Sequence, residues 1–202
     1  MTMQLMWDEH LKYGYYPVDP ADWPYDATYF DKYVGLDATE LGHKLTAFRA
    51  DLVQRYAPER VIDIGIGGGG FINELIRRKI QVVGSDVNPK GIDWLKERQL
   101  YRTADIEIDA ATFWDSFEHI PRPDKALSNV RRFAFISIPI FQDREQTLAS
   151  KHFKPAEHYY YFHHKGLIGF MFSQGFRLLK FCATETKLGR EDILSYVFQR
   201  MA

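Results

Sequence analysis

A glycine-rich stretch behind a short apolar run is the part of the sequence best suited to chemistry. Residues 61–64 (VIDI) predict a buried strand, and five glycines follow within residues 65–70. Glycine lets the backbone approach a ligand closely, and the helix predicted to follow begins with free backbone N–H groups. In open parallel sheets, ligands bind beyond the carboxyl ends of the strands. The stretch therefore predicts a site for a nucleotide-like ligand.

Two cofactors fit the spacing of these glycines. Gly65, Gly67 and Gly70 match the dinucleotide pattern G-x-G-x-x-G. Asp63, Gly65, Gly67 and Gly69 match D-x-G-x-G-x-G instead. A carboxylate at the strand end can accept a hydrogen bond from the cationic amino group of S-adenosylmethionine, whereas it is poorly placed beside a pyrophosphate. We therefore predict S-adenosylmethionine as the cofactor.

A second acidic residue ends the next predicted strand. Residues 82–84 are apolar and are followed by Ser85 and Asp86. The distance from the glycines is close to the interval at which an acidic residue meets the ribose in doubly wound folds. A carboxylate can accept hydrogen bonds from both ribose hydroxyls. Asp86 is therefore predicted to bind the ribose, and the alternative is a helix cap.

Histidines are the candidate general bases, because imidazole titrates near neutral pH. His119 follows the fourth predicted strand, where a substrate would enter, and is the first candidate; His158 is the second. A hydrogen-bonded structural role is the alternative for each. His163 and His164 are adjacent and would diverge, and Cys182 is the only cysteine, so we expect no metal site.

Strands and helices alternate along the chain in the order needed to position these residues. This alternation favours an α/β fold with a parallel sheet covered on both faces. A helix capped by Asp37 or Thr39 precedes the first strand, and a short connection at residues 188–190 makes the last two strands an antiparallel pair. The strands are predicted at residues 61–64, 82–84, 106–114, 133–138, 177–183 and 193–199.

Aromatic side chains crowd the beginning of the chain. Residues 1–36 hold nine of them, and prolines at positions 17, 20 and 24 oppose a long helix. Two interpretations stay open: an irregular arm that covers hydrophobic surface, and a lid over a ligand.

Composition sets the outer limits of the function. The 202 residues fit one domain, and 26 Lys and Arg against 27 Asp and Glu give a net charge of −1. Binding to a phosphate backbone usually needs a basic excess, so nucleic acid is disfavoured as a partner, although a local basic face stays open. No apolar run approaches the roughly 20 residues of a membrane helix, and the start lacks a signal-peptide pattern. With a single cysteine, we expect a cytoplasmic protein that has no membrane partner.

Four stretches together resemble the class I S-adenosylmethionine-dependent methyltransferases. The third is similar to the "FDVV…D-x-LEH" pattern of one large branch, and the fourth resembles that branch's "EH…F…L…GF" segment. The likeness extends over roughly residues 45–200. The four stretches are residues 61–70, 82–89, 108–120 and 157–176.

The resemblance implies a Rossmann-like, doubly wound mixed sheet of six to seven strands with a C-terminal antiparallel hairpin. Between Asp93 and Ile106 there is little room for a helix and a further strand, so the third strand is expected to be truncated or missing. We predict an aromatic arm or lid at residues 1–36 and a methyltransferase domain at residues 37–202.

The resemblance also implies roles for individual residues. Asp63 and the glycines would flank the methionine moiety of the cofactor. Asp86, with Val87 beside it, would take the ribose. Trp114 and Asp115 would lie near the methionine end, with His119 at the substrate mouth. Asp105 is the nearest candidate for the acid that contacts adenine in this family.

A small-molecule acceptor is the substrate class that this branch implies. Methylation of the acceptor would be an in-line displacement at the methyl group of the sulfonium. Positioning of the acceptor would then supply much of the rate enhancement. The alternatives are a nucleic-acid or nucleotide methyltransferase and a non-catalytic cofactor-binding protein. A methyltransferase acting on DNA amino groups would carry an Asn/Asp-Pro-Pro-Tyr run after the fourth strand, and this sequence has Trp-Asp-Ser-Phe there. The acceptor and the oligomeric state stay open.

Overall fold

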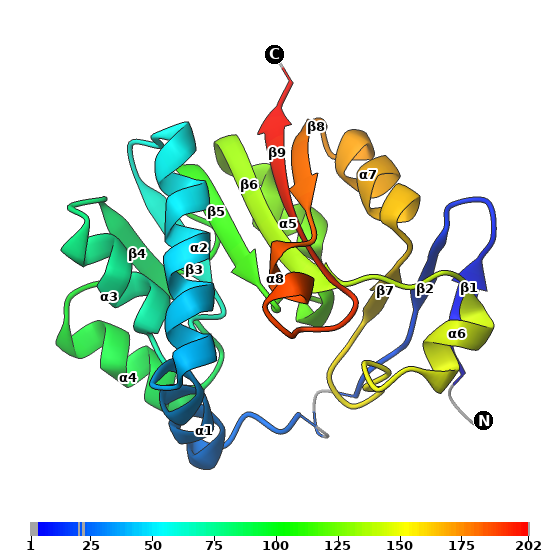
Figure 1. The fold of residues 1–202 in the computed structure, drawn as a ribbon, viewed down its shortest axis with the longest axis horizontal. Helices are drawn as coiled ribbons and strands as arrows, with labels where there is room; N and C mark the ends of the chain where they lie inside the picture. Colours follow the sequence, from blue (N-terminus) through cyan, green and yellow to red (C-terminus); the bar gives the residue numbers. More distant parts are fainter. Residues whose placement is uncertain (1–3, 20, 22, 202) are drawn as a thin grey trace.

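A six-stranded mixed sheet forms the centre of the protein (Figure 1). The computed structural model describes residues 4–19, 21 and 23–201. The sheet order is β4-β3-β5-β6-β9-β8; the first four strands are parallel, and β9 runs antiparallel to both of its neighbours, β6 and β8. The predicted mixed sheet with a C-terminal hairpin is confirmed. The strands are β3 (Val61–Ile64), β4 (Val82–Ser85), β5 (Ile108–Trp114), β6 (Val130–Pro139), β8 (Phe176–Cys182) and β9 (Ile193–Arg200).

The third strand is reduced to a single contact. In the described part of the chain, an isolated parallel bridge between Gly84 and Tyr101 stands beside β4 where a full strand was possible. The truncation expected from the short spacing is therefore confirmed. The chain order reverses between β4 and β5, which lie on opposite sides of β3, so the carboxyl end of β3 is a topological switch point.

Helices cover both faces of this sheet (Figure 1). The buried faces of α2, α3 and α4 pack on one side, and those of α5 and α7 pack on the other. Thr39 caps α2, as one of the two predicted caps, and Pro89 and Pro123 open α4 and α5. None of the helices in the described chain is long and apolar enough to span a membrane. The helices are α2 (Glu40–Tyr56), α3 (Gly70–Arg77), α4 (Pro89–Glu97), α5 (Pro123–Ser128) and α7 (His164–Ser173).

The N-terminal segment is more regular than the sequence predicted. It forms β1 (Met6–Asp8), β2 (Tyr13–Tyr15) and an 11-residue helix, α1 (Ala27–Asp37). β1, β2 and β7 (Tyr160–Phe162) build a separate three-stranded antiparallel sheet. The prolines oppose a helix only up to position 24, because Asp26 then caps α1 through the backbone N–H groups of its first turn.

The connection inside the C-terminal hairpin was predicted too short. β8 and β9 pair antiparallel, but a one-turn helix, α8 (Thr184–Lys187), lies between them and is visible in front of the sheet in Figure 1. Elsewhere, α6 (Arg144–Ala149) follows β6, and a 3-10 turn, η2 (Phe117–His119), follows β5. α8 and η2 each place a glutamate in the interior, Glu185 and Glu118.

Candidate active site

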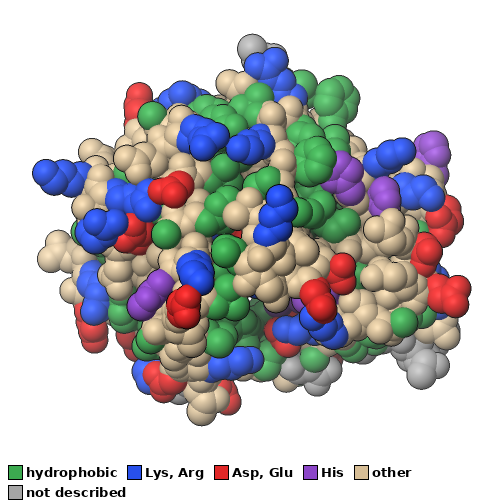
Figure 2. All heavy atoms as spheres, viewed as in Figure 1, with side chains coloured by type: hydrophobic (Ala, Val, Ile, Leu, Met, Phe, Trp, Pro, Cys, Tyr) green, Lys and Arg blue, Asp and Glu red, His purple; other side chains and the backbone are tan. Residues whose placement is uncertain are grey.

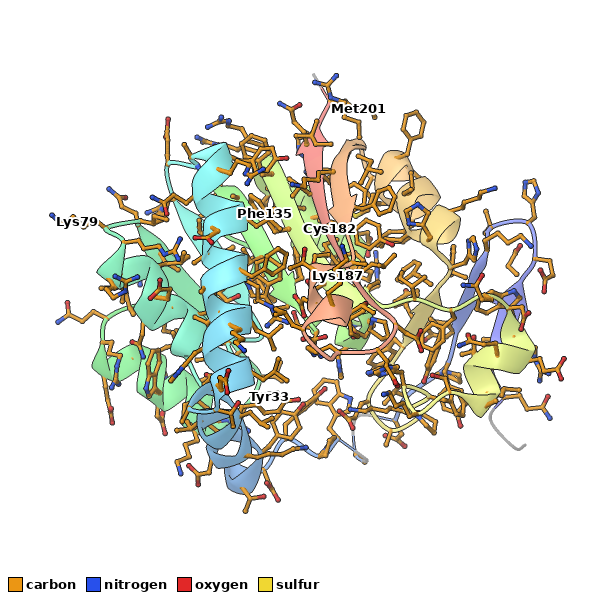
Figure 3. The ribbon with its side chains drawn as sticks, viewed as in Figure 1. Tyr33, Lys79, Phe135, Cys182, Lys187 and Met201 are labelled. Atoms are coloured by element: carbon orange, nitrogen blue, oxygen red, sulfur yellow. The ribbon has the colours of Figure 1, made fainter. Side chains whose placement is uncertain are left out.

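A largely apolar cavity of about 240 Å³ opens at the carboxyl ends of β3, β4 and β5. This is the switch point at which a ligand is expected in such a sheet. Its roof consists of aromatic side chains from residues 23–33, including Tyr33 of α1, which Figure 3 labels. Seven of the predicted site residues line it: Gly65, Gly67, Asp86, Val87, Trp114, Asp115 and His119.

Three predicted site residues lie outside this lining: Asp63, Gly69 and His158. Gly69 takes a φ of +83°, and a Cβ there would lie 2.7 Å from the Trp94 ring. The glycine therefore serves the packing of α4 against the loop, and its backbone conformation would strain any other residue. The weak candidate for adenine contact, Asp105, is exposed, accepts a hydrogen bond from Thr103 and does not line the cavity either.

Asp86 fastens the glycine loop to the end of β4. One carboxylate oxygen accepts the backbone N–H of Ile66 at 2.8 Å and the other accepts that of Asn88 at 2.7 Å. Burial raises the pKa of the Asp86 carboxyl, and the two backbone N–H groups oppose the rise. The side chain thus holds the loop in place and faces the cavity at the same time.

Asp63 lies beneath the loop, in the sheet itself. Its side chain is 1% exposed, and Thr112 on β5 donates a 2.7 Å hydrogen bond to its Oδ1. Burial raises the pKa of Asp63 to about 7; Thr112 and Arg49 lower it, and Asp86 adds to the rise. The prediction that Asp63 borders the ligand was made from the strand end, but this side chain points toward the neighbouring strand.

Asp37 occupies the N-terminus of α3, a place that the sequence did not reveal. The backbone N–H of Gly70 donates to Asp37 Oδ2 at 2.9 Å. A Cβ on Gly68 would lie 2.5 Å from the backbone nitrogen of Val34, so this glycine lets α1 approach the loop. Asp37 was predicted as a possible cap of α2, and it caps α3 instead. A pyrophosphate would need the same helix N-terminus, which argues against a dinucleotide.

Asp115 is held in a partly buried network of four charged side chains. Arg49 donates to Asp115 at 2.9 Å and to Glu185 at 2.8 Å, and Arg190 contacts the same two carboxylates at 2.7 Å and 2.6 Å. Burial would raise the pKa of Asp115, but Arg190 and Arg49 hold it at about 2. Asp115 takes a φ of +56°, a strained conformation for a non-glycine residue.

His119 and His158 meet edge to face beside the cavity. Their ring centroids are 4.4 Å apart, and the Tyr25 hydroxyl lies 2.9 Å from His119 Nδ1. His119 lines the cavity, whereas His158 lies behind it and is 3% exposed. Burial lowers the pKa of His119 to about 4 and that of His158 well below its usual value. Both rings are neutral at pH 7, and His119 is a weaker base than the sequence suggested.

Sequence reasoning missed several residues of this site. Arg49, Glu185 and Arg190 come from α2, α8 and the loop after it, so no local pattern connects them with Asp115. Glu118 is buried beside the two histidines, a placement that no spacing in the sequence revealed. These contacts depend on the assembled fold and leave no spacing in the sequence that could have identified them.

Known proteins resemble this chain in sequence and in fold. The sequence profile of a methyltransferase domain matches residues 38–180. A curated relative, a ubiquinone biosynthesis O-methyltransferase from Chromobacterium violaceum, is 27% identical over a match that covers 42% of this chain and 45% of that protein. The chain therefore matches less than half the length of that relative.

Two solved structures of known methyltransferases share the fold. The magnesium protoporphyrin IX methyltransferase of Synechocystis, with bound S-adenosylhomocysteine, has a TM-score of 0.65 at 15% identity; the match covers 86% of this chain and 95% of that one. The 1,6-didemethyltoxoflavin-N1-methyltransferase of Burkholderia thailandensis, also with S-adenosylhomocysteine, has a TM-score of 0.62 at 13% identity, covering 98% and 100%. At these identities the likeness concerns the fold.

Proposed function

The chain belongs to the methyltransferase domain family, whose members use S-adenosylmethionine, and from this premise we propose that it methylates a small-molecule acceptor by in-line displacement. The observation that carries the proposal is the small apolar cavity at the switch point, bounded by the glycine loop, Asp86 and His119. A cavity of this kind excludes water and holds a cofactor against a compact acceptor. The relatives are named for O-methylation in ubiquinone biosynthesis, for methylation of magnesium protoporphyrin IX and for N1-methylation of 1,6-didemethyltoxoflavin, and these small-molecule reactions support the same class.

The cofactor is proposed to lie along the glycine loop. Gly65 and Gly67 offer backbone to its methionine part, and Asp86 with Val87 faces its ribose. A carboxylate has about four acceptor positions, and the backbone N–H groups of Ile66 and Asn88 each use one of those of Asp86, so positions are left for the ribose hydroxyls.

The charges near the loop favour a cationic ligand. Three aspartates, Asp37, Asp63 and Asp86, lie close together. The negative charges of Asp37 and Asp86 raise the pKa of Asp63. S-adenosylmethionine carries a sulfonium and an ammonium, whereas a dinucleotide brings a negative pyrophosphate. Negative charge at this loop therefore favours the sulfonium ligand over NAD.

The acceptor is proposed to enter beside Trp114, Asp115 and His119. Trp114 ends β5, Asp115 and His119 follow it, and all three line the cavity. The aromatic side chains of residues 23–33 cover this region, and we propose that residues 1–36 act as a lid over the bound molecules. On the face shown in Figure 2, acidic and basic side chains are interspersed, which agrees with a small acceptor rather than a nucleic-acid backbone.

Calorimetric titration with S-adenosylmethionine, S-adenosylhomocysteine and NAD tests the cofactor assignment. We expect stoichiometric binding of both sulfur ligands and none of NAD. Binding of NAD alone would contradict the proposal. If none of the three ligands bound, the cavity would not be a site for this cofactor. Transfer of a labelled methyl group to candidate acceptors then tests the reaction itself.

Asp86→Ala is expected to weaken S-adenosylhomocysteine binding by about 1.5–3 kcal/mol, or roughly 10- to 150-fold in Kd, the scale of hydrogen bonds to a charged group. The variant loses the ribose acceptor and also loosens the Ile66 end of the loop. Asp31→Ala, at an exposed carboxylate paired with Lys90, is the matched control and should leave Kd unchanged. An unaltered Kd in Asp86→Ala would remove Asp86 from the site.

A further inference from the structure

Three potential metal ligands meet behind the mouth of the cavity. Glu118, His119 and His158 each offer a ligand atom, and these atoms lie within 4.8 Å of one another. Glu118 and His119 stand on η2, and His158 stands in the segment before β7. The backbone N–H of Tyr159 donates to the carbonyl of Glu118 at 2.9 Å, which ties the two segments together.

Two of these side chains hold a buried polar atom without a partner. Glu118 is 2% exposed and His158 is 3% exposed. Among the described residues, neither Glu118 Oε2 nor His158 Nδ1 has a hydrogen-bond partner. An unsatisfied buried polar atom costs about 1–3 kcal/mol, and two in one cluster call for a specific explanation.

We propose that Glu118, His119 and His158 bind a divalent first-row transition-metal ion through two imidazole nitrogens and one carboxylate oxygen. Two imidazoles and a carboxylate suit Mn²⁺, Fe²⁺, Co²⁺ or Zn²⁺. Metal–ligand bonds of about 2.0–2.2 Å place neighbouring ligand atoms about 3–3.5 Å apart, so the three side chains would close inward on binding. The metal would satisfy both orphaned atoms at once.

The burial and hydrogen bonding of the three side chains suit a cation site. Burial raises the pKa of Glu118 well above its usual value and lowers the pKa of both histidines. Metal binding needs neutral imidazoles and an ionised carboxylate, so an arriving cation would displace any proton that these ligands carry. The Tyr25 hydroxyl, 2.9 Å from His119 Nδ1, fixes the orientation of that ring, as hydrogen bonds commonly do for metal-binding histidines.

The metal would also define the acceptor, an extension that rests on the proposed function. Three protein ligands leave coordination positions open, and His119 borders the cavity, so an acceptor hydroxyl can bind there. The metal would lower the pKa of that hydroxyl, so that the proton can leave without a protein base. The hydroxyl proton then leaves to solvent, the oxygen forms the new C–O bond to the methyl carbon, and the C–S electron pair returns to sulfur.

Titration of the tag-free, chelator-treated full chain with Co²⁺, without any cofactor, tests the metal site. We expect one equivalent to bind, seen by calorimetry and by visible absorption bands, and Glu118→Gln and His158→Ala to weaken binding at least 10-fold. His43→Ala, at an exposed histidine of α2, is the matched control and should bind as the wild type does.

Two results would overturn the site: no stoichiometric Co²⁺ binding by the wild type, or unchanged binding in both variants. Circular dichroism checks that each variant is folded, and His158→Gln replaces His158→Ala if the latter is not. S-adenosylhomocysteine titration of the same samples separates the two proposals. Cobalt binding without cofactor binding would contradict the proposed function alone, and the reverse would contradict the metal site alone.

Discussion

Replacing Arg49 with methionine is expected to lower the free energy of unfolding by about 3–5 kcal/mol, the usual cost of leaving a buried charge without its partner. Arg49 bridges Asp115 and Glu185, and the Glu185 side chain is fully buried. Arg190 alone would then face two carboxylates that two arginines now neutralise. Methionine keeps the apolar length of the side chain, so the loss reports on charge more than on packing.

Urea unfolding at pH 7 measures this effect. The matched control is Arg77→Met, because Arg77 is 70% exposed in its pair with Glu74 and should change stability by less than about 1 kcal/mol. A loss below 1 kcal/mol in Arg49→Met would mean that the network contributes little to folding. Because Asp115 lines the cavity, the variant should also bind S-adenosylhomocysteine more weakly than the control does.

Local pattern was sufficient for the elements that carry the cofactor loop. The run of β-branched residues at β3, the glycines after it and the cap and proline signals at Thr39, Pro89 and Pro123 are all read within a few residues. Each reports a short-range preference of the backbone, which the tertiary structure did not override. The truncated third strand followed from chain length alone, because the segment was too short to hold a full strand.

Pairing between distant segments could not be predicted from the sequence. β1 and β2 are three residues each, too short for alternation to reveal them, and they exist because β2 pairs with β7. Asp37 reaches Gly70 only because glycine at position 68 lets α1 approach the loop. Such contacts depend on close packing in the folded protein, so the residue types alone did not predict them.

For Asp63, the sequence predicted the place in the chain but not the direction of the side chain. Its place in the strand was predicted correctly, since it stands in β3, two residues before the first glycine. All four residues of this strand are buried, because β3 lies in the interior of the sheet with helices on both faces. The alternation that shows which way a side chain points was therefore absent, and the carboxyl faces Thr112 rather than the cavity.

The burial of Asp63 predicts a stability that depends on pH. Its pKa is about 7 in the folded protein and 3.8 as the ordinary value, so the folded state keeps a proton that the unfolded chain loses. The unfolded state binds fewer protons between these values, and the free energy of unfolding therefore falls as the pH rises from about 4 to 7. The shift corresponds to a total loss of about 4 kcal/mol, which is complete above pH 7.

Asp63→Asn should remove this loss, because the amide stays neutral and its oxygen can still accept the Thr112 hydrogen bond. Measured by urea unfolding, the stability of the variant minus that of the wild type should grow by about 2–3 kcal/mol between pH 5 and pH 8. Contributions of Glu118 and His158 are common to both proteins and cancel in the difference. Asp105→Asn, at an exposed position, is the control and should have the same pH dependence of stability as the wild type. An equal difference at pH 5 and pH 8 would show that Asp63 is already ionised in the folded protein, and that the positive charge of Arg49 outweighs its burial.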